Sequence, residues 1–225
     1  ALEALAADDS AVADAAAEFF VAVVSPAAQS WQSVPAEETA AIVGVCRGLI
    51  AHGERAVALN DPCASEDLAR NVCVVAVALC ERDADVAAGI DASPEFLGLM
   101  ECVLRLVETH ERPVMEAAAD YFLMLNTVPT STRHPSAGAP LFTRLAASCL
   151  KHAELPPDFT SWEEADEDRD TFVRFREQIL ADLLGNCQAQ MRSGYLREVG
   201  TALMESTSWN RAEACVFATR AVASY

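Results

Sequence analysis

The sequence predicts an all-α protein. Its 225 residues are 52% hydrophobic and 22% charged, which is enough apolar material for a sizeable core. The apolar residues recur at spacings of three and four, the period of one helix face, rather than alternating as they do in a half-buried strand. Ser, Asp or Pro followed by acidic residues stands before most of these runs, as is usual at helix N-termini. Together these observations favour helices and make strands improbable.

Nine helices are expected, at about residues 9–25, 33–53, 65–84, 93–112, 113–128, 140–155, 166–192, 195–204 and 208–225. Asp9 or Ser10 starts the first helix, because either side chain can cap it. Residues 19–24 of that helix are apolar all round, so we expect them to be covered on more than one side. Ser33 and two first-turn carboxylates start the second helix, and Gly53 is expected to close it.

The third helix contains the valine-rich run 72–80, which by periodicity alone could also be a buried strand. A cap at Ser65 and a continuous length of about 18 residues favour helix. The next two helices open at Ser93 and at Pro113, with only about two or three residues between them. We therefore expect them to form an antiparallel hairpin.

In the last third of the chain, an acidic segment leads into a helix with a single apolar stripe at Phe172, Phe175, Ile179, Leu183 and Cys187. The final helix follows a cap at 206–208, and its predicted inward stripe contains Trp209, Ala212, Val216 and Ala223. Thr219 interrupts that stripe and is expected to bond its hydroxyl back to the preceding turn.

The helix pairs start near residues 33, 93, 139 and 194, on the order of 45 to 60 residues apart, close to the spacing of HEAT and armadillo units. We predict an α-solenoid of antiparallel helix pairs (HEAT/armadillo-like) in one stretch over 1–225. The expected pairs are near 9–53, 65–84, 93–128, 139–192 and 194–225, with inter-helix loops at 129–140 and 154–170. The chain begins with Ala, shows no signal-peptide pattern and ends without a polar capping unit, so we expect a fragment of a longer solenoid.

The formal charge of −18 disfavours nucleic acid and anionic membrane surfaces as partners and favours basic proteins. The longest apolar run, 72–80, is far shorter than the about 20 residues of a membrane span. Seven cysteines lie among aliphatic neighbours and are interpreted as small buried hydrophobes of a reducing compartment: Cys46, Cys73, Cys80, Cys102, Cys149, Cys187 and Cys215. Scattered histidines, the lack of a Cys-x-x-Cys pair and the lack of a Gly-rich phosphate loop predict no metal, no cofactor and no enzymatic activity.

Two segments resemble a known family. The run 111–125 is similar to the second helix of a HEAT repeat in the importin-β (karyopherin) superfamily. The run Asp170-Thr171-Phe172-Val173-Arg174-Phe175-Arg176, its acidic leader and the later Ser208–Cys215 segment resemble the transportin-3/importin-13 branch of that superfamily. The resemblance covers about residues 93–225 and is only architectural before them. It implies that Phe172, Phe175 and Trp209 are core residues and that Glu213 faces a neighbouring helix.

The resemblance implies a segment of a nuclear transport receptor, which carries protein cargo through the nuclear pore and shuttles between nucleus and cytoplasm. It further implies Ran GTPase binding by regions outside this fragment, and apolar clefts between outer helices for nucleoporin Phe-Gly repeats. Carboxylates before the 170–176 motif would attract Lys/Arg-rich cargo. The candidate cargo-binding residues are Trp162, Glu163, Glu164, Asp166, Glu167, Asp168 and Asp170.

Two alternatives stand beside this interpretation. The acidic segment could equally be a solvated loop, with Trp162 packed back onto the repeats. The chain could also belong to a HEAT/armadillo scaffold or adaptor for protein complexes unrelated to nuclear transport.

Overall fold

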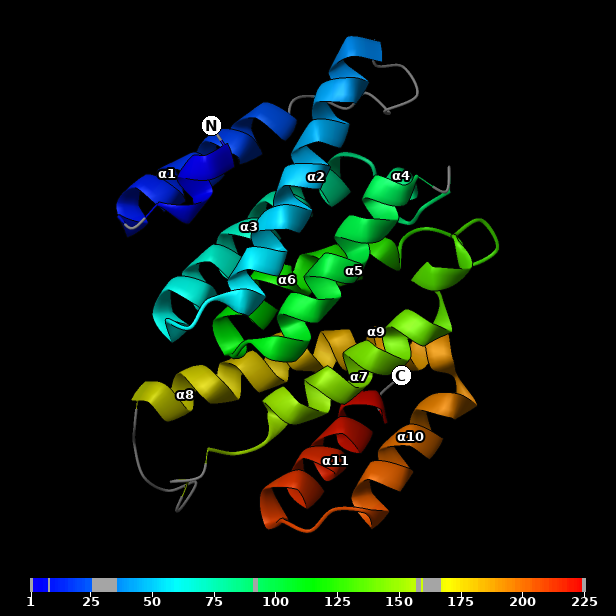
Figure 1. Ribbon diagram of the computed structural model, residues 1–225. Coiled ribbons are helices and arrows are strands. Elements are labelled where there is room, and N and C mark those ends of the chain that lie inside the picture. Colours follow the sequence, from blue (N-terminus) through cyan, green and yellow to red (C-terminus); the bar gives the residue numbers. More distant parts are fainter. Residues whose placement is uncertain are drawn as a thin grey trace. The chain divides into compact units, whose positions relative to one another are not determined.

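The structure, a computed structural model, describes residues 2–7, 9–25, 36–90, 93–156, 159 and 167–223. Within these ranges every regular element is a helix, which confirms the predicted all-α class (Figure 1). The chain divides into two compact units, Ala1–Ala137 and Gly138–Tyr225, which are described separately. None of the helices in the described ranges has the length and apolar content that crossing a membrane requires.

The first unit contains the 3-10 helices η1 (Leu2–Ala6) and η3 (Pro135–Ala137) and the helices α1 (Ser10–Val24), α2 (Ala36–Ala58), α3 (Pro62–Arg82), α4 (Ala84–Ala87), α5 (Pro94–Thr109) and α6 (Arg112–Leu125). α2 and α5 lie side by side in one layer, and α3 packs against both α1 and α6 in the other (Figure 1). α3 also packs on α2, so it has neighbours on several sides. This position explains why the valine-rich run 72–80 is almost entirely buried, and it is helical as predicted.

Local capping chemistry sets the starts of four described helices, α1, α3, α4 and α11. Asp9 caps α1 as expected, because its carboxylate accepts a hydrogen bond from the Ala11 N–H at 3.0 Å. The predicted cap of α3 was wrong: Asp61 accepts from two first-turn N–H groups, so the helix starts at Pro62, three residues before Ser65.

Ser65 instead helps to join three helices. Its hydroxyl donates to the Ala56 carbonyl of α2 at 2.7 Å and lies 2.9 Å from His110 Nε2. The other ring nitrogen of His110, Nδ1, lies 3.0 Å from the Leu106 carbonyl near the end of α5. These groups are buried, and their contacts satisfy polar atoms where α2, α3 and α5 meet.

Two further expectations for the first unit were wrong. α2 passes through Gly53 and ends at Ala58. In α1, Phe20 and Val24 are buried, but Phe19 and Val23 are about half exposed, so the second half of this helix is covered on one side only. The covered side is the one toward α3 and η1.

The second unit contains α7 (Ala139–Ala153), α8 (Glu167–Arg174), the π-helical turn η4 (Phe175–Leu180), α9 (Ala181–Met191), α10 (Ser193–Met204) and α11 (Trp209–Val222). α8, η4 and α9 follow one another without a break. α7 packs on α9 and α11, and α10 packs on α11.

The π-helical turn changes the predicted apolar stripe. Phe172 and Phe175 are buried as predicted, as are Leu183 and Cys187 further along. Ile179, however, is only half-buried, and Leu180 is fully buried in its place. A π-helical turn holds one residue more than an α-turn, so the inward position falls five residues after Phe175 instead of four.

In α11 the predicted stripe was also wrong. Trp209 is 73% exposed, and the buried residues are Ala214, Cys215, Phe217 and Ala218. Trp209 precedes Ala214 by five residues and therefore lies about 140° away from it around the helix. The Thr219 hydroxyl does bond back to the Cys215 carbonyl, at 2.9 Å, as predicted.

The predicted burial of the cysteines is confirmed. The seven cysteines expected in the core are buried as free thiols, and Cys63 near the start of α3 is exposed.

Candidate functional site

The acidic cargo site predicted from the sequence lies mostly beyond what the structure describes. Trp162, Glu163, Glu164 and Asp166 are outside the described residues. Glu167 and Asp168 are described by their backbone, in the first turn of α8. Asp170 follows in the same helix, with an exposed carboxylate that pairs with Arg169 at 2.9 Å. The structure thus places three predicted site residues within four positions of one helix start, and their role in cargo binding remains a prediction.

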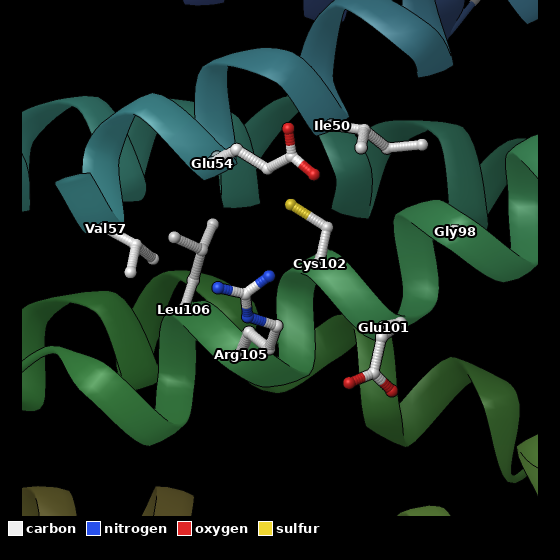
Figure 2. A pocket seen from close by; sticks show the side chains of 9 residues that line it. Ile50, Glu54, Val57, Gly98, Glu101, Cys102, Arg105 and Leu106 are labelled. Atoms are coloured by element: carbon white, nitrogen blue, oxygen red, sulfur yellow. The ribbon is translucent and has the colours of Figure 1, made fainter.

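The described part of the first unit offers a different site, a groove of about 220 Å³ between α2 and α5. Figure 2 shows apolar residues from both helices with charged side chains around them. The groove is lined by Ile50, Gly53, Glu54, Val57, Gly98, Glu101, Cys102, Arg105 and Leu106.

Two glycines bring the helices together at this groove. A Cβ on Gly53 would lie 2.2 Å from Cys102 Sγ, and a Cβ on Gly98 would lie 3.0 Å from Ile50 Cδ1. Both distances are shorter than ordinary van der Waals contact, so any larger residue at Gly53 would force α2 and the Cys102 thiol apart. Gly53 therefore serves the packing of two helices rather than the end of one, and α2 continues past it to Ala58.

The two helices keep a constant register along the groove. Beside it, Arg47 Nη2 and Glu95 Oε1 form an ion pair at 2.6 Å, and the hydrogen bond from Arg47 is the main cause of the lowered pKa of Glu95. The contacting pairs Arg47–Glu95, Ile50–Gly98 and Gly53–Cys102 are each separated by 48 or 49 residues in sequence. A constant separation means that α2 and α5 run in the same direction, as equivalent helices of successive repeats do.

The Cys102 thiol forms an inert floor. Burial raises its pKa to about 12; the carboxylates of Glu54 and Glu101 also raise it, and Arg105 opposes them. At neutral pH the thiol is therefore protonated and behaves as a small apolar group rather than as a nucleophile. Among the described side chains, no three His, Cys, Asp or Glu residues come together in a way that could hold a metal ion.

This geometry suits binding better than catalysis. The groove offers apolar contact from Ile50, Val57 and Leu106 and charged groups at its edge, so it can hold one large apolar side chain of a partner. Sequence reasoning missed it because Gly53 looked like a helix end and Cys102 like an ordinary core residue. No local signal in the sequence marks the groove, because Gly53 approaches a residue that follows it by 49 positions.

Comparison with known proteins supports the fold. No family model matches the chain, and no curated protein sequence matches it significantly. A solved structure of importin 13 in its cytosolic state superposes with a TM-score of 0.74 over 96% of this chain, at 16% sequence identity. The match covers 27% of the importin 13 chain, so this chain spans about a quarter of that protein's length. The predicted resemblance is thus confirmed at the level of fold: the chain has the HEAT-repeat α-solenoid fold of a stretch of importin 13.

Proposed function

We propose that this chain is a segment of a nuclear transport receptor that binds protein cargo and the Phe-Gly repeats of the nuclear pore. The observation that carries the proposal is the fold shared with importin 13 over 96% of the chain. As in such a receptor, the chain acts by binding rather than by catalysis. It shuttles between nucleus and cytoplasm, and Ran GTPase regulates it through regions of a longer solenoid outside this chain.

Basic cargo is assigned to the acidic segment 162–170, whose last residues belong to the first turn of α8. The net charge of −18 attracts Lys/Arg-rich sequences at long range, and carboxylates bind them by charge-assisted hydrogen bonds. The direct test is charge reversal to Lys at Glu163, Glu164 and Asp166, with binding to a basic peptide measured at two salt concentrations. Weaker binding with a smaller salt dependence is expected.

A matched control has the same change in net charge elsewhere. Glu18, Glu81 and Asp120 are exposed carboxylates of the first unit, and the structure places them on α1, α3 and α6. If reversing these three weakens binding as much as reversing the acidic segment, total charge and not the segment attracts the peptide, and the assignment fails.

The Phe-Gly repeats are assigned to the groove between α2 and α5, which takes the phenylalanine ring. Val57 stands at its edge and is 36% exposed, so Val57→Asp places a carboxylate in the apolar site without removing a core residue. Loss of Phe-Gly peptide binding is expected in a fluorescence or NMR titration. Val23→Asp on α1, which alters a more exposed valine outside the groove, is the control and should bind normally.

The effect of the Ran GTPase on cargo release distinguishes the transport-receptor proposal from the scaffold alternative. The longer protein that contains this chain should release its cargo when Ran loaded with GTP is added. Equal release with and without Ran-GTP would reject the transport-receptor proposal and leave a repeat scaffold.

A further inference from the structure

We propose that Glu54 and Arg105 form a two-sided clamp for the main chain of the peptide whose apolar side chain enters the α2/α5 groove. Glu54 accepts from a peptide N–H on one wall, and Arg105 donates to a peptide carbonyl on the other. The inference rests on the proposed function, because it assigns the residues that orient the partner at the same groove.

The first support is the position of the two charges. Glu54 belongs to α2 and Arg105 to α5, and Figure 2 shows their charged ends on different sides of the Cys102 thiol at the centre of the groove. Both side chains are exposed. Both residues line the groove together with Cys102, and each acts on the pKa of that thiol, the carboxylate raising it and the guanidinium lowering it.

The second support is that these charges do not neutralise each other. Along the same pair of helices, Arg47 and Glu95 do meet across the seam at 2.6 Å. Glu54 and Arg105, by contrast, make no ion pair with any residue that the structure describes. A carboxylate and a guanidinium therefore stand apart over an apolar floor, with their hydrogen-bonding capacity available to a partner.

The third step is the chemistry of the partner. A peptide whose side chain enters the groove brings its main-chain N–H and C=O groups to the edge of the groove. These groups lose bound water there, which is costly unless they gain a new hydrogen-bond partner. A carboxylate can only accept and a guanidinium can only donate, so each wall fits one kind of main-chain group. The clamp thus favours one direction of the peptide chain across the groove, in addition to holding the peptide there.

Glycine beside the aromatic residue suits such a clamp. A residue without a Cβ lets the main chain approach the walls closely and turn where it must. Glu101, on α5, adds a second carboxylate at the edge, so an uncharged or basic flank is favoured over an acidic one. The chemistry points to an aromatic-glycine segment with no acidic residue beside it.

The test uses the full chain and a short peptide with one Phe-Gly pair between Ser residues. Glu54→Ala and Arg105→Ala should each weaken binding about tenfold, the usual size of one hydrogen bond to a charged group. The matched controls are Glu18→Ala and Arg55→Ala, which remove exposed charges away from the clamp and should bind as the unaltered chain does. Circular dichroism checks that all four variants keep their helices.

A chemical variant of the peptide makes the test specific. With the N–H groups beside the phenylalanine methylated, the peptide should lose affinity for the unaltered chain, and Glu54→Ala should have no further effect. Arg105→Ala should still weaken its binding, because the carbonyls remain. These two results together support the clamp.

The proposed function and the clamp fail differently. If Glu54→Ala and Arg105→Ala bind the peptide normally while Val57→Asp abolishes binding, the groove is the site and the clamp is refuted. If Val57→Asp also binds normally, the groove assignment itself is refuted, and the clamp with it.

Discussion

Arg176 shows how one residue of the second unit holds a charge inside the core. It is 3% exposed, and its Nη2 donates to both carboxylate oxygens of Glu213, at 2.8 and 2.9 Å. Its guanidinium also lies 4.2 Å from the centre of the Phe217 ring. The predicted role of Glu213, to face a neighbouring helix, is therefore confirmed, and its partner is a cation that needs it.

Removing Glu213 should be costly for that reason. Glu213→Ala leaves Arg176 buried without its counter-ion and should lower the free energy of unfolding by about 3 kcal/mol. Urea denaturation followed by circular dichroism measures the loss. Glu198→Ala, an exposed carboxylate of α10, is the control, with an expected change below about 0.5 kcal/mol. Equal effects of the two changes would mean that the Arg176 pair contributes nothing.

Two aromatic residues from the family-like motifs should behave oppositely. Phe175 is 2% exposed and Trp209 is 73% exposed. Phe175→Ala should cost about 3 to 5 kcal/mol, because it empties a packed site. Trp209→Ala should cost less than about 1 kcal/mol. A larger loss for Trp209 than for Phe175 in the same denaturation experiment would contradict the placement of both side chains.

The cysteines give a third residue-level prediction. Burial raises the pKa of the Cys46, Cys80 and Cys102 thiols to about 12, so at pH 7 to 8 they are protonated as well as shielded. We expect one fast-reacting thiol in the native chain, Cys63, and eight after denaturation, measured with a chromogenic disulfide reagent. Cys63→Ser should remove the fast phase; if it persists, one of the buried sites opens easily.

At the scale of elements, the π-helical turn η4 can be tested by deletion. Deleting the exposed Gln178 would bring Phe175 and Leu180 to the four-residue spacing of an α-helix while leaving both helix flanks facing as they do now. We expect unit 2 to stay folded, with a stability change of about 1 kcal/mol or less. Deletion of Asn186 in regular α9 is the contrast, because it turns the following residues by about 100° and should unfold the unit. Circular dichroism and urea melts distinguish the two; equal damage would argue against the π-turn.

Some features of these helices could be predicted from the local sequence, and others could not. Caps such as Asp9 and the Thr219 back-bond depend on residues a few positions apart, so they could be predicted from the local sequence. The shift from Ile179 to Leu180 depends on what packs around the turn. The role of Gly53 depends on Cys102, which comes from another repeat. Which residues of a helix face the core, and how closely two helices approach, depend on residues that are distant in sequence. A single sequence does not identify those neighbours.

At the scale of the whole molecule, the fold class followed from periodicity because every helix repeats the same signal. The groove between α2 and α5 could not be predicted in this way, because residues that meet across it are 48 or 49 positions apart in sequence and neither helix carries a motif of its own. The repeat spacing expected from helix starts, about 45 to 60 residues, was close to this value but too loose to align individual residues. The pairing of helices into the five predicted segments remains a prediction.

The net charge of −18 predicts a response of the whole chain to salt. Like charges repel more in the compact state than in the unfolded chain, and salt screens that repulsion. Between about 10 mM and 150 mM ionic strength the screening length falls from about 30 to 8 Å, so the melting temperature should rise. Differential scanning calorimetry measures it. A fall would mean that surface ion pairs such as Arg70–Asp14 contribute more than the repulsion.

The contact between Ser65 and His110 limits where the hydrogen atoms of the His110 ring can be. Ser65 has one hydroxyl hydrogen, which its contact with the Ala56 carbonyl uses, so the contact with His110 Nε2 needs a hydrogen from the ring. The other ring nitrogen, Nδ1, lies 2.9 Å from the Thr109 hydroxyl, which has a hydrogen of its own, as well as 3.0 Å from the Leu106 carbonyl. The tautomer of one buried ring is therefore tied to the joining of α2, α3 and α5.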